Sequence, residues 1–180
     1  MKKFWIIPIA AALAVAFTAC GAGSVSDVSS ALAGAVSSQA ASSQAASSAV
    51  QVQQSGVSDD LAGLQKYLVG NAGVSGTAET MRGDMIGAKA GVRYKYDHNG
   101  KNNVTLELYE FDPDKLDATG EKVLSDVKLT GKFTVFGQQV SAVPSRNGKY
   151  LMVYKNTADD DDNKAYGEQV KKLFTEFKAE

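Results

Sequence analysis

The sequence predicts an α+β domain with two N-terminal helices, an antiparallel meander sheet of about five strands, and a C-terminal amphipathic helix. Three observations lead to this fold class. Apolar residues recur at helical spacing near both ends of residues 57–180, they alternate with polar residues in between, and two Asn-Gly pairs separate alternating stretches. The length of this segment is ordinary for one domain with its own core, so we expect residues 57–180 to form a single domain.

Two helices are expected before the sheet. Ser58 can cap the first, and Asp59-Asp60 would place two carboxylates at the positive end of its dipole. Gly70 is its predicted C-terminal stop, and its apolar face consists of Leu61, Leu64 and Leu68. Thr77 is predicted to cap the second helix, whose apolar stripe consists of Ala78, Met81, Met85 and Ala88.

The sheet is predicted from two antiparallel ribbons. Residues 92–96 and 104–111 alternate in polarity on either side of Asn99-Gly100, a pair that favours a tight hairpin turn. The second ribbon is expected after Gly120. Its parts are, in order, residues 127–129, a bulge at Thr130-Gly131, residues 133–135, residues 140–143, a turn at Asn147-Gly148, and residues 150–154.

The last helix has the clearest pattern in the chain. Its apolar residues stand at i, i+4, i+7, i+8 and i+11, which makes one continuous stripe of Tyr166, Val170, Leu173, Phe174 and Phe177. Three amphipathic helices can cover one face of a single sheet. We expect the other face to be partly exposed, with the side chains of Arg93, Lys95, Thr105, Glu107 and Tyr109 on it.

The N-terminus has the layout of a secretory signal peptide. Lys2 and Lys3 precede an uncharged stretch, residues 4–17, and small residues then lead to Cys20. This stretch is shorter than the roughly 20 residues that a membrane-spanning helix needs. We therefore expect residues 1–19 to be a signal peptide.

Thr18-Ala19-Cys20-Gly21 resembles the lipobox of bacterial lipoproteins, in which the cysteine after two small residues is lipidated and becomes the mature N-terminus. Phe17 departs from that pattern, which more often has Leu there. The resemblance implies a lipid anchor on Cys20 that holds the chain at the extracytoplasmic face of a bacterial cell membrane. Cys20 is the only cysteine, so the domain can form no internal disulfide. The alternative is an ordinary signal peptide followed by an incidental cysteine.

Residues 20–56 are predicted to be the lipidated cysteine and a disordered tether between the lipid and the domain. Ser, Ala, Gln and Gly supply 29 of the 36 residues that follow Cys20, and none of the 36 is aromatic. Such a stretch buries too little apolar surface to offset the entropy lost on ordering. The alternative is an Ala-rich helix, which the paired serines disfavour.

The supply of reactive side chains limits the chemistry. His98 is the only histidine and lies in a predicted turn, whereas a catalytic or zinc site needs a second base or a thiol. Asp112, Asp114 and Asp117, and separately residues 159–162, offer oxygen ligands of the kind that calcium takes. Neither stretch has the EF-hand spacing, and the second precedes the last helix, where carboxylates oppose the dipole. We assign no catalytic, metal-binding or cofactor-binding residue.

Tyrosines on the predicted strands are the best candidates for binding. A sheet face that the helices leave uncovered would present some of them, and tyrosine combines apolar area with a polar tip. The candidate binding face consists of Tyr94, Tyr96, Tyr109, Tyr150 and Tyr154.

These features predict a lipid-anchored extracytoplasmic domain that binds an envelope protein, peptide or glycan. Without Lys2 and Lys3, 17 Lys and Arg stand against 20 Asp and Glu, a balance that argues against nucleic acid as a partner. The alternative is an enzyme that acts on cell-wall glycan through a carboxylate pair, whose separation the sequence does not report.

Met85-Ile86-Gly87-Ala88 and Gly91-Val92-Arg93-Tyr94 resemble a stretch of small uncharacterised lipoproteins of Gram-positive bacteria, a resemblance that implies no activity.

Overall fold

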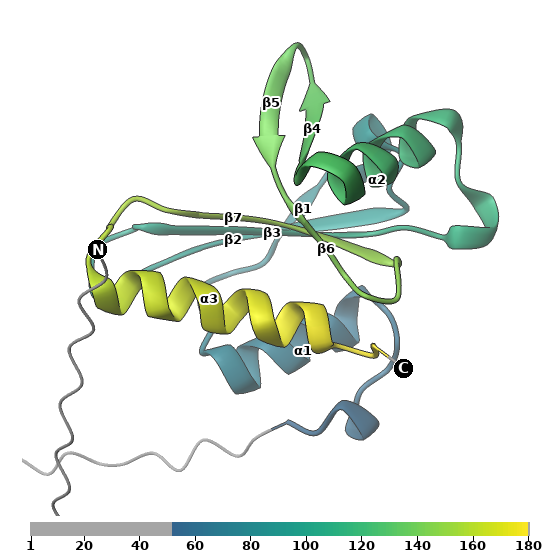
Figure 1. The fold of residues 1–180 in the computed structure, drawn as a ribbon. Helices are drawn as coiled ribbons and strands as arrows, with labels where there is room; N and C mark the ends of the chain where they lie inside the picture. Colours follow the sequence, from purple (N-terminus) through teal and green to yellow (C-terminus); the bar gives the residue numbers. More distant parts are fainter. Residues whose placement is uncertain (1–51, 180) are drawn as a thin grey trace, which may run out of the picture. The chain divides into compact units, whose positions relative to one another are not determined.

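A five-stranded antiparallel sheet runs through the part of the chain that the computed structural model describes, residues 52–179 (Figure 1). Its strand order is β1-β2-β3-β7-β6. The strands are β1 (Glu79–Met81), β2 (Ala90–Tyr96), β3 (Val104–Glu110), β6 (Val143–Pro144) and β7 (Tyr150–Asn156). The predicted α+β class and antiparallel sheet are therefore confirmed. The predicted signal peptide, the lipid on Cys20 and most of the tether lie outside the described residues.

Two helices, α1 (Leu61–Ala72) and α3 (Asp161–Glu176), cover one face of this sheet (Figure 1). We call it the helical face. Alternate strand residues such as Tyr94, Leu106 and Met152 point at the helices and are buried with them in the larger core. The predicted stripe of the last helix is confirmed, because Tyr166, Val170, Phe174 and Phe177 are buried in this core and Leu173 is half-buried against it.

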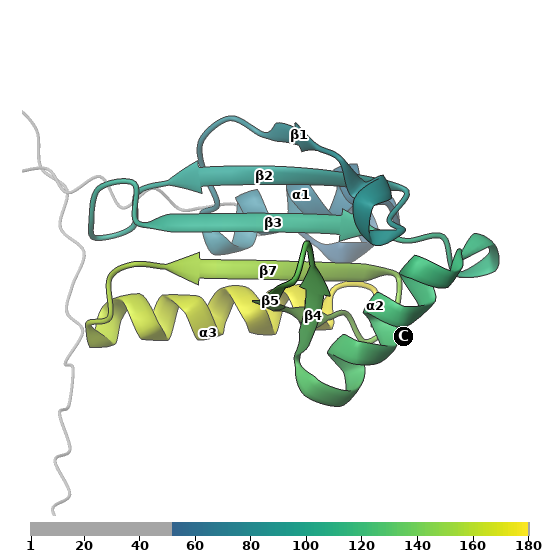
Figure 2. The same ribbon diagram turned by 90° about the horizontal axis from the view of Figure 1, so that it is seen from above.

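A smaller unit covers part of the opposite face. It consists of α2 (Ala118–Thr130) and the hairpin of β4 (Lys132–Val135) and β5 (Gln138–Ser141), all inserted between β3 and β7. Its core residues include Val123, Val127, Phe133 and Ala142, which pack with Tyr109, Phe111 and Leu151 of the sheet. Figure 2 looks down on this face and shows that no helix lies over most of β2.

The predicted second ribbon is wrong over residues 127–129, which belong to α2. The Asp117 side chain caps this helix by accepting the Gly120 N–H at 2.7 Å, and Gly131, at a φ of 70°, ends it. Val127 is buried but Leu129 is 80% exposed, so the two do not share a strand face. The expected bulge at Thr130-Gly131 is a helix C-cap. The sheet is consequently interrupted by α2 and the β4–β5 hairpin and is not a simple meander.

The predicted second N-terminal helix, near residues 77–88, is also wrong. Its sequence forms β1 and then a 3-10 turn (Gly83–Ile86), which Gly87 closes at a φ of 71°. A Cβ on Gly83 would lie 2.9 Å from the Ala88 carbonyl oxygen, so the glycine permits this tight turn. Met81 is paired with Gly91 of β2. The apolar residues here have helical spacing, but the pairing of β1 with β2 at the sheet edge and the turn permitted by Gly83 and Gly87 determine the backbone conformation.

The first helix differs from its prediction at both ends. Asp60, and not Ser58, is the N-cap, and its carboxylate accepts the Gly63 N–H at 2.7 Å. The helix continues through Gly70 and ends at Gly73, whose φ is 66°. A Cβ on Gly70 would lie 2.2 Å from the Val52 side chain, which packs on the larger core. The folded part of the chain therefore includes residues that we expected in the tether, because Val52 has apolar surface to bury.

The two Asn-Gly pairs have different outcomes. Asn147-Gly148 does lie in the turn between β6 and β7, with Gly148 at a φ of 72°. Asn99-Gly100 lies in a longer loop, because Tyr96 pairs with Val104 and residues 97–103 connect them. Asn99 and Asn102 take the positive φ angles of that loop, 48° and 47°. A two-residue turn at Asn99-Gly100 is therefore wrong.

Candidate functional site

The predicted tyrosine face is not exposed. Tyr94, Tyr96, Tyr109 and Tyr150 are at most 6% exposed, and Tyr154 is half-buried. Their hydroxyls are used inside the fold: Tyr96 and Tyr166 share a hydrogen bond of 2.8 Å, and Tyr150 donates to Asp59 at 2.7 Å. Burial raises the pKa of the Tyr96 and Tyr150 hydroxyls. The expected exposure of Tyr94, Tyr96, Tyr109 and Tyr150 is wrong, because α1 and α3 cover one side of the sheet and the inserted unit covers Tyr109 on the other.

His98 has a packing role in the loop between β2 and β3. Its ring stacks on Tyr166 of α3 with 3.6 Å between ring centroids. The adjoining buried Asn103 accepts the His98 backbone N–H and donates to the side chains of Asn156 and Asn163. This amide cluster joins the loop to β7 and to the start of α3.

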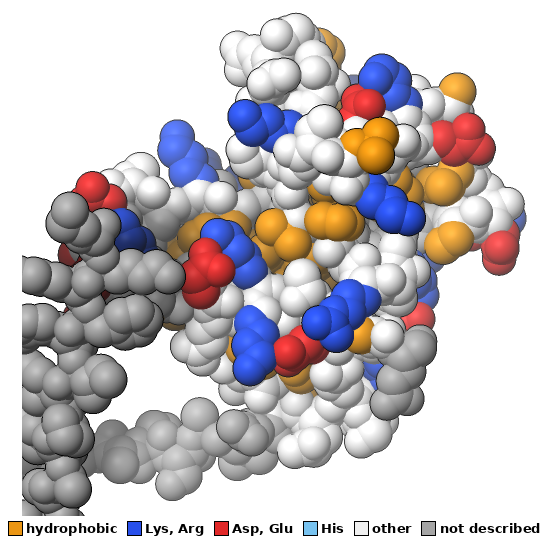
Figure 3. Space-filling model, in the orientation of Figure 1, with side chains coloured by type: hydrophobic (Ala, Val, Ile, Leu, Met, Phe, Trp, Pro, Cys, Tyr) orange, Lys and Arg blue, Asp and Glu red, His pale blue; other side chains and the backbone are white. Residues whose placement is uncertain are grey.

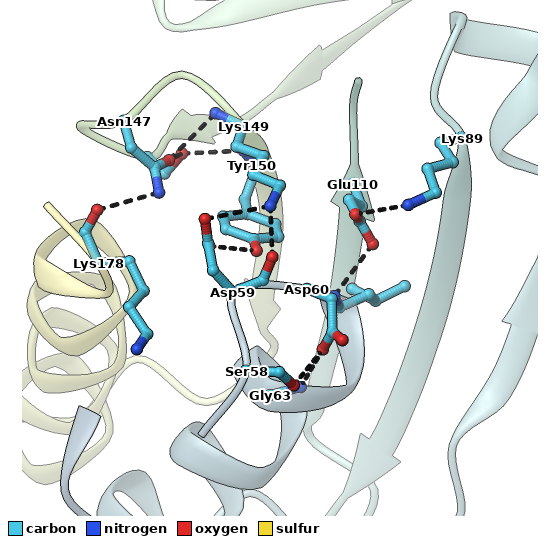
Figure 4. Close-up of polar contacts among 12 residues, drawn as sticks. Ser58, Asp59, Asp60, Gly63, Lys89, Glu110, Asn147, Lys149, Tyr150 and Lys178 are labelled. Carbon is cyan, nitrogen blue, oxygen red and sulfur yellow. Dashed lines mark hydrogen bonds and ion pairs between the residues drawn. The ribbon is translucent and has the colours of Figure 1, made fainter. Parts of the chain in front are cut away.

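Three carboxylates, those of Asp59, Asp60 and Glu110, lie close together where α1 begins, as Figure 4 shows. The buried Glu110 accepts the Leu61 N–H and the Lys89 ammonium, each at 3.0 Å. Asp59 accepts the Tyr150 hydroxyl and forms an ion pair with Lys149 at 3.1 Å. Each of these groups has a structural partner, so the cluster fixes the N-terminus of α1 to β3 and β7.

Three of the remaining acidic candidates, Asp112, Asp117 and Asp160, are helix caps, and Asp114, Asp161 and Asp162 lie in the first turns that follow. The carboxylates of Asp112 and Asp160 accept the backbone N–H groups of Asp114 and Asn163, as Asp117 does at α2. The Asn163 N–H holds the pKa of Asp160 below its ordinary value. Within residues 52–179, no group of three His, Cys, Asp or Glu side chains is placed to hold a metal ion.

The edge of the sheet at β7 is only partly occupied. β6 pairs with Met152 and Leu151 and with no further residue of β7. Among the described residues, 153–156 of β7 therefore pair with β3 alone. Pro144, whose ring has no N–H to donate, could have indicated from the sequence that β6 is an edge strand.

The backbone groups that face this open edge follow from strand alternation. The Tyr150 carbonyl accepts the Ser145 N–H on the β6 side, whereas the Lys149 carbonyl accepts the Phe111 N–H on the β3 side. Because successive residues of a strand point their backbone groups to opposite sides, Tyr154 and Asn156 point theirs to the β6 side. No strand among the described residues bonds to these groups.

Apolar side chains surround the open edge. Figure 3 views the molecule from this side and shows a band of them between the inserted unit and α3. Val153 and Tyr154 are half-buried there, and Gly167 of α3 lies directly against the Tyr154 ring. At the β6 end a cleft of about 540 Å³ opens, lined by Leu124, Ser125, Lys128, Pro144, Ser145, Arg146 and Gly148. We call the open part of β7 and this cleft the edge site.

Positive charge borders the edge site. Lys155 of β7 is exposed on the face of the sheet opposite the helices. Lys95 is exposed on the same face but lies on β2, with β3 between it and β7, and Glu107 of β3 is bonded to Arg93 at 2.6 Å. On the other side, Lys164 and Lys171 stand one turn of α3 before and after Gly167. Lys171 is paired with Glu168 at 2.7 Å, so Lys164 is the cation on this side that has no ion-pair partner among the described residues. Figure 3 shows Lys and Arg side chains both above and below the apolar band.

The chain matches no protein family model, no curated protein and no solved structure. None of the helices in residues 52–179 has the length and apolar content to cross a membrane.

Proposed function

We propose that this chain is a lipid-anchored binding domain at the extracytoplasmic face of a bacterial membrane, and that the edge site holds its partner. The observation that carries the binding function is the open edge of β7 beside half-buried Val153 and Tyr154. A sheet edge with unpaired backbone groups and adjoining apolar surface is a template for association. The lipobox resemblance at Cys20 supports the location.

Three carboxyl groups, those of Asp60, Asp84 and Asp160, give no support to the alternative, an enzyme acting on cell-wall glycan. A general acid in such an enzyme needs a raised pKa. The pKa of Asp60 is lowered by the Gly63 N–H, that of Asp84 by its hydrogen bond from Arg82, and that of Asp160 as described above. None of these three carboxyl groups is suited to donate a proton near neutral pH.

Site-specific photo-crosslinking in native membranes tests the binding function. A photoreactive residue in place of Lys155 is expected to capture a partner, because this position borders the edge site. The same residue in place of Lys66, which is exposed on α1, is the matched control. Equal capture at both positions, or capture at neither, would contradict the proposal.

The anchor is tested separately with Cys20→Ser. We expect this variant to leave the membrane fraction, because the cysteine would carry the acyl chains. Unchanged membrane partitioning of the variant would refute the lipid anchor and leave the binding proposal intact.

A further inference from the structure

We propose that the ligand of the edge site is an extended acidic peptide segment of another protein, which adds as a strand antiparallel to β7. This inference rests on the proposed binding function and names its partner class. It follows from the backbone groups, the space beside them and the charge around them.

The backbone groups require a partner with the repeat of a strand. Tyr154 and Asn156 direct their N–H and C=O groups to the open edge, two residues apart. An extended polypeptide presents complementary groups at the same interval, about 6.6 to 6.8 Å. Strand addition of this kind draws its affinity from main-chain hydrogen bonds and its specificity from alternate side chains.

The position of β6 beside β7 indicates where an added strand would lie. β6 runs antiparallel to β7, with Pro144 opposite Leu151 and Val143 opposite Met152. The next residue, Ala142, turns away, because its N–H bonds to the Gly131 carbonyl at 2.9 Å. Ser141 is paired with Lys132 in the hairpin. Within residues 52–179, no strand therefore continues the line of β6 beyond Val143, and a second polypeptide can take this position.

The side chains around the edge select the sequence of the ligand. A ligand residue opposite Tyr154 lies on the helical face, where the half-buried ring favours an apolar neighbour. A residue opposite Lys155 lies on the face opposite the helices, beside the exposed Lys155 ammonium, where a carboxylate is favoured. The preferred ligand therefore alternates apolar and acidic residues.

The same charges disfavour a second copy of this chain as the occupant. Edge-to-edge pairing of two β7 strands would bring the exposed Lys155 of one copy toward Lys155 of the other. Like charges opposed across strands are destabilising. An acidic segment from a different protein removes that repulsion.

Two synthetic peptides with blocked ends test the inference on the full chain. One alternates Val with Glu and the other alternates Val with Lys. We expect the Glu peptide to bind at least about tenfold more tightly, which corresponds to about 1.4 kcal/mol. With the Glu peptide bound, the amides of Tyr154 and Asn156 should exchange more slowly with solvent. Those of Val153 and Lys155 should not change, since they already face β3.

N-methylation of the Glu peptide gives the sharpest control. Methyl groups on the residues whose N–H faces β7 should abolish binding, whereas methyl groups on the alternate residues should leave it intact. Lys155→Glu should reverse the preference between the two peptides, and Lys66→Glu, on the exposed side of α1, should not.

Three outcomes would overturn the inference. The first is equal binding of both peptides. The second is binding without protection at Tyr154. The third is a dimer whose Tyr154 amide is protected without peptide, which would identify a second copy as the occupant. If crosslinking at Lys155 succeeds while the Glu peptide fails, the proposed binding function stands and the strand inference falls. If both fail, both are refuted.

Discussion

The two faces of the sheet are covered by different means. On the helical face α1 contributes six buried residues and α3 five, and with the strands they form a continuous core that includes Tyr150 and Phe174. On the opposite face α2 contributes three, and the β4–β5 hairpin adds the buried Phe133. Packing on the helical face therefore provides most of the stability of the domain. On the opposite face, α2 and the β4–β5 hairpin cover only part of the sheet, and an edge of β7 remains available for association.

The largest effect expected from this contrast is in the helical core. Phe174 is fully buried, so Phe174→Ala should lower the free energy of unfolding by about 3 to 5 kcal/mol. Phe133→Ala, at 4% exposure in the smaller core, should cost less, because the hairpin can open without unfolding the sheet. Urea denaturation of both variants measures the difference. An equal loss for both would show that the two faces unfold as one unit.

The buried tyrosines predict a loss of stability at high pH. Their folded pKa lies above the ordinary value of 10.0, because burial disfavours the anion of Tyr96, Tyr109 and Tyr150. The stabilisation is complete below about pH 10, where the unfolded tyrosines are protonated, and falls as pH rises toward the folded pKa. Thermal melts at about pH 8 and about pH 11 should show a clearly lower Tm at the higher pH. Tyr96→Phe should reduce this dependence, and an unchanged profile would contradict the assignment.

The helix caps of the two faces make a matched pair. Asp60 and Asp117 each accept a backbone N–H at 2.7 Å, from Gly63 and Gly120. Asp60→Ala should cost about 1 kcal/mol of global stability. Below about pH 4 the difference from the parent should shrink, because the lowered pKa of Asp60 makes its contribution disappear as the carboxylate is protonated.

Asp117→Ala should instead act locally on α2. Amide exchange should accelerate in α2 before it accelerates in the sheet, since α2 belongs to the smaller core. Uniform acceleration over the whole domain would contradict this separation of the two faces.

The smallest expected effect is a gain in stability at the hairpin tip. Phe136 is 81% exposed and has a φ of 51°, followed by Gly137 at 75°. A bulky residue is costly at such an angle, whereas Asn-Gly is favoured in this two-residue turn. Phe136→Asn should raise the free energy of unfolding by about 0.5 to 1 kcal/mol. A loss in a urea titration would indicate that the Phe136 ring packs against the domain.

In the elements that could be predicted, local sequence preference and tertiary packing favour the same secondary structure. The stripe from Tyr166 to Phe177 is helical in spacing and follows the cap Asp160, so α3 formed where it was expected. Most of β2 and β3 alternates in polarity because one face is buried in the larger core. β7 is apolar over residues 150–154 because both of its faces pack on a core. Where local sequence preference and tertiary packing favour the same structure, the structure of a segment can be predicted from its sequence.

The errors fall where a short apolar pattern fits two structures. Val127 and Leu129 match the alternation of a strand, but Val123 and Val127 also match one turn of a helix, and the Asp117 cap decides for the helix. At residues 77–88 the apolar spacing was helical. Pairing of β1 with β2 and the turn near Gly83 and Gly87 outweighed it.

The edge site itself was not predictable. The positions of the tyrosines on predicted strands suggest a binding face, yet which sheet face is covered depends on how α1, α3 and the inserted unit pack. That the β6 strand ends after two residues depends on Ala142 bonding to Gly131.

The sequence alone was enough to predict the class of the domain, the last helix, the three central strands and the carboxylates at the start of the last helix, which include the cap Asp160. These are local or periodic properties, and each depends on residues a few positions apart. Only the tertiary structure decided that the tyrosines are buried and that Tyr154 and Asn156 face an open edge. Those properties depend on which distant segments pack together, and burial is a property of the whole fold.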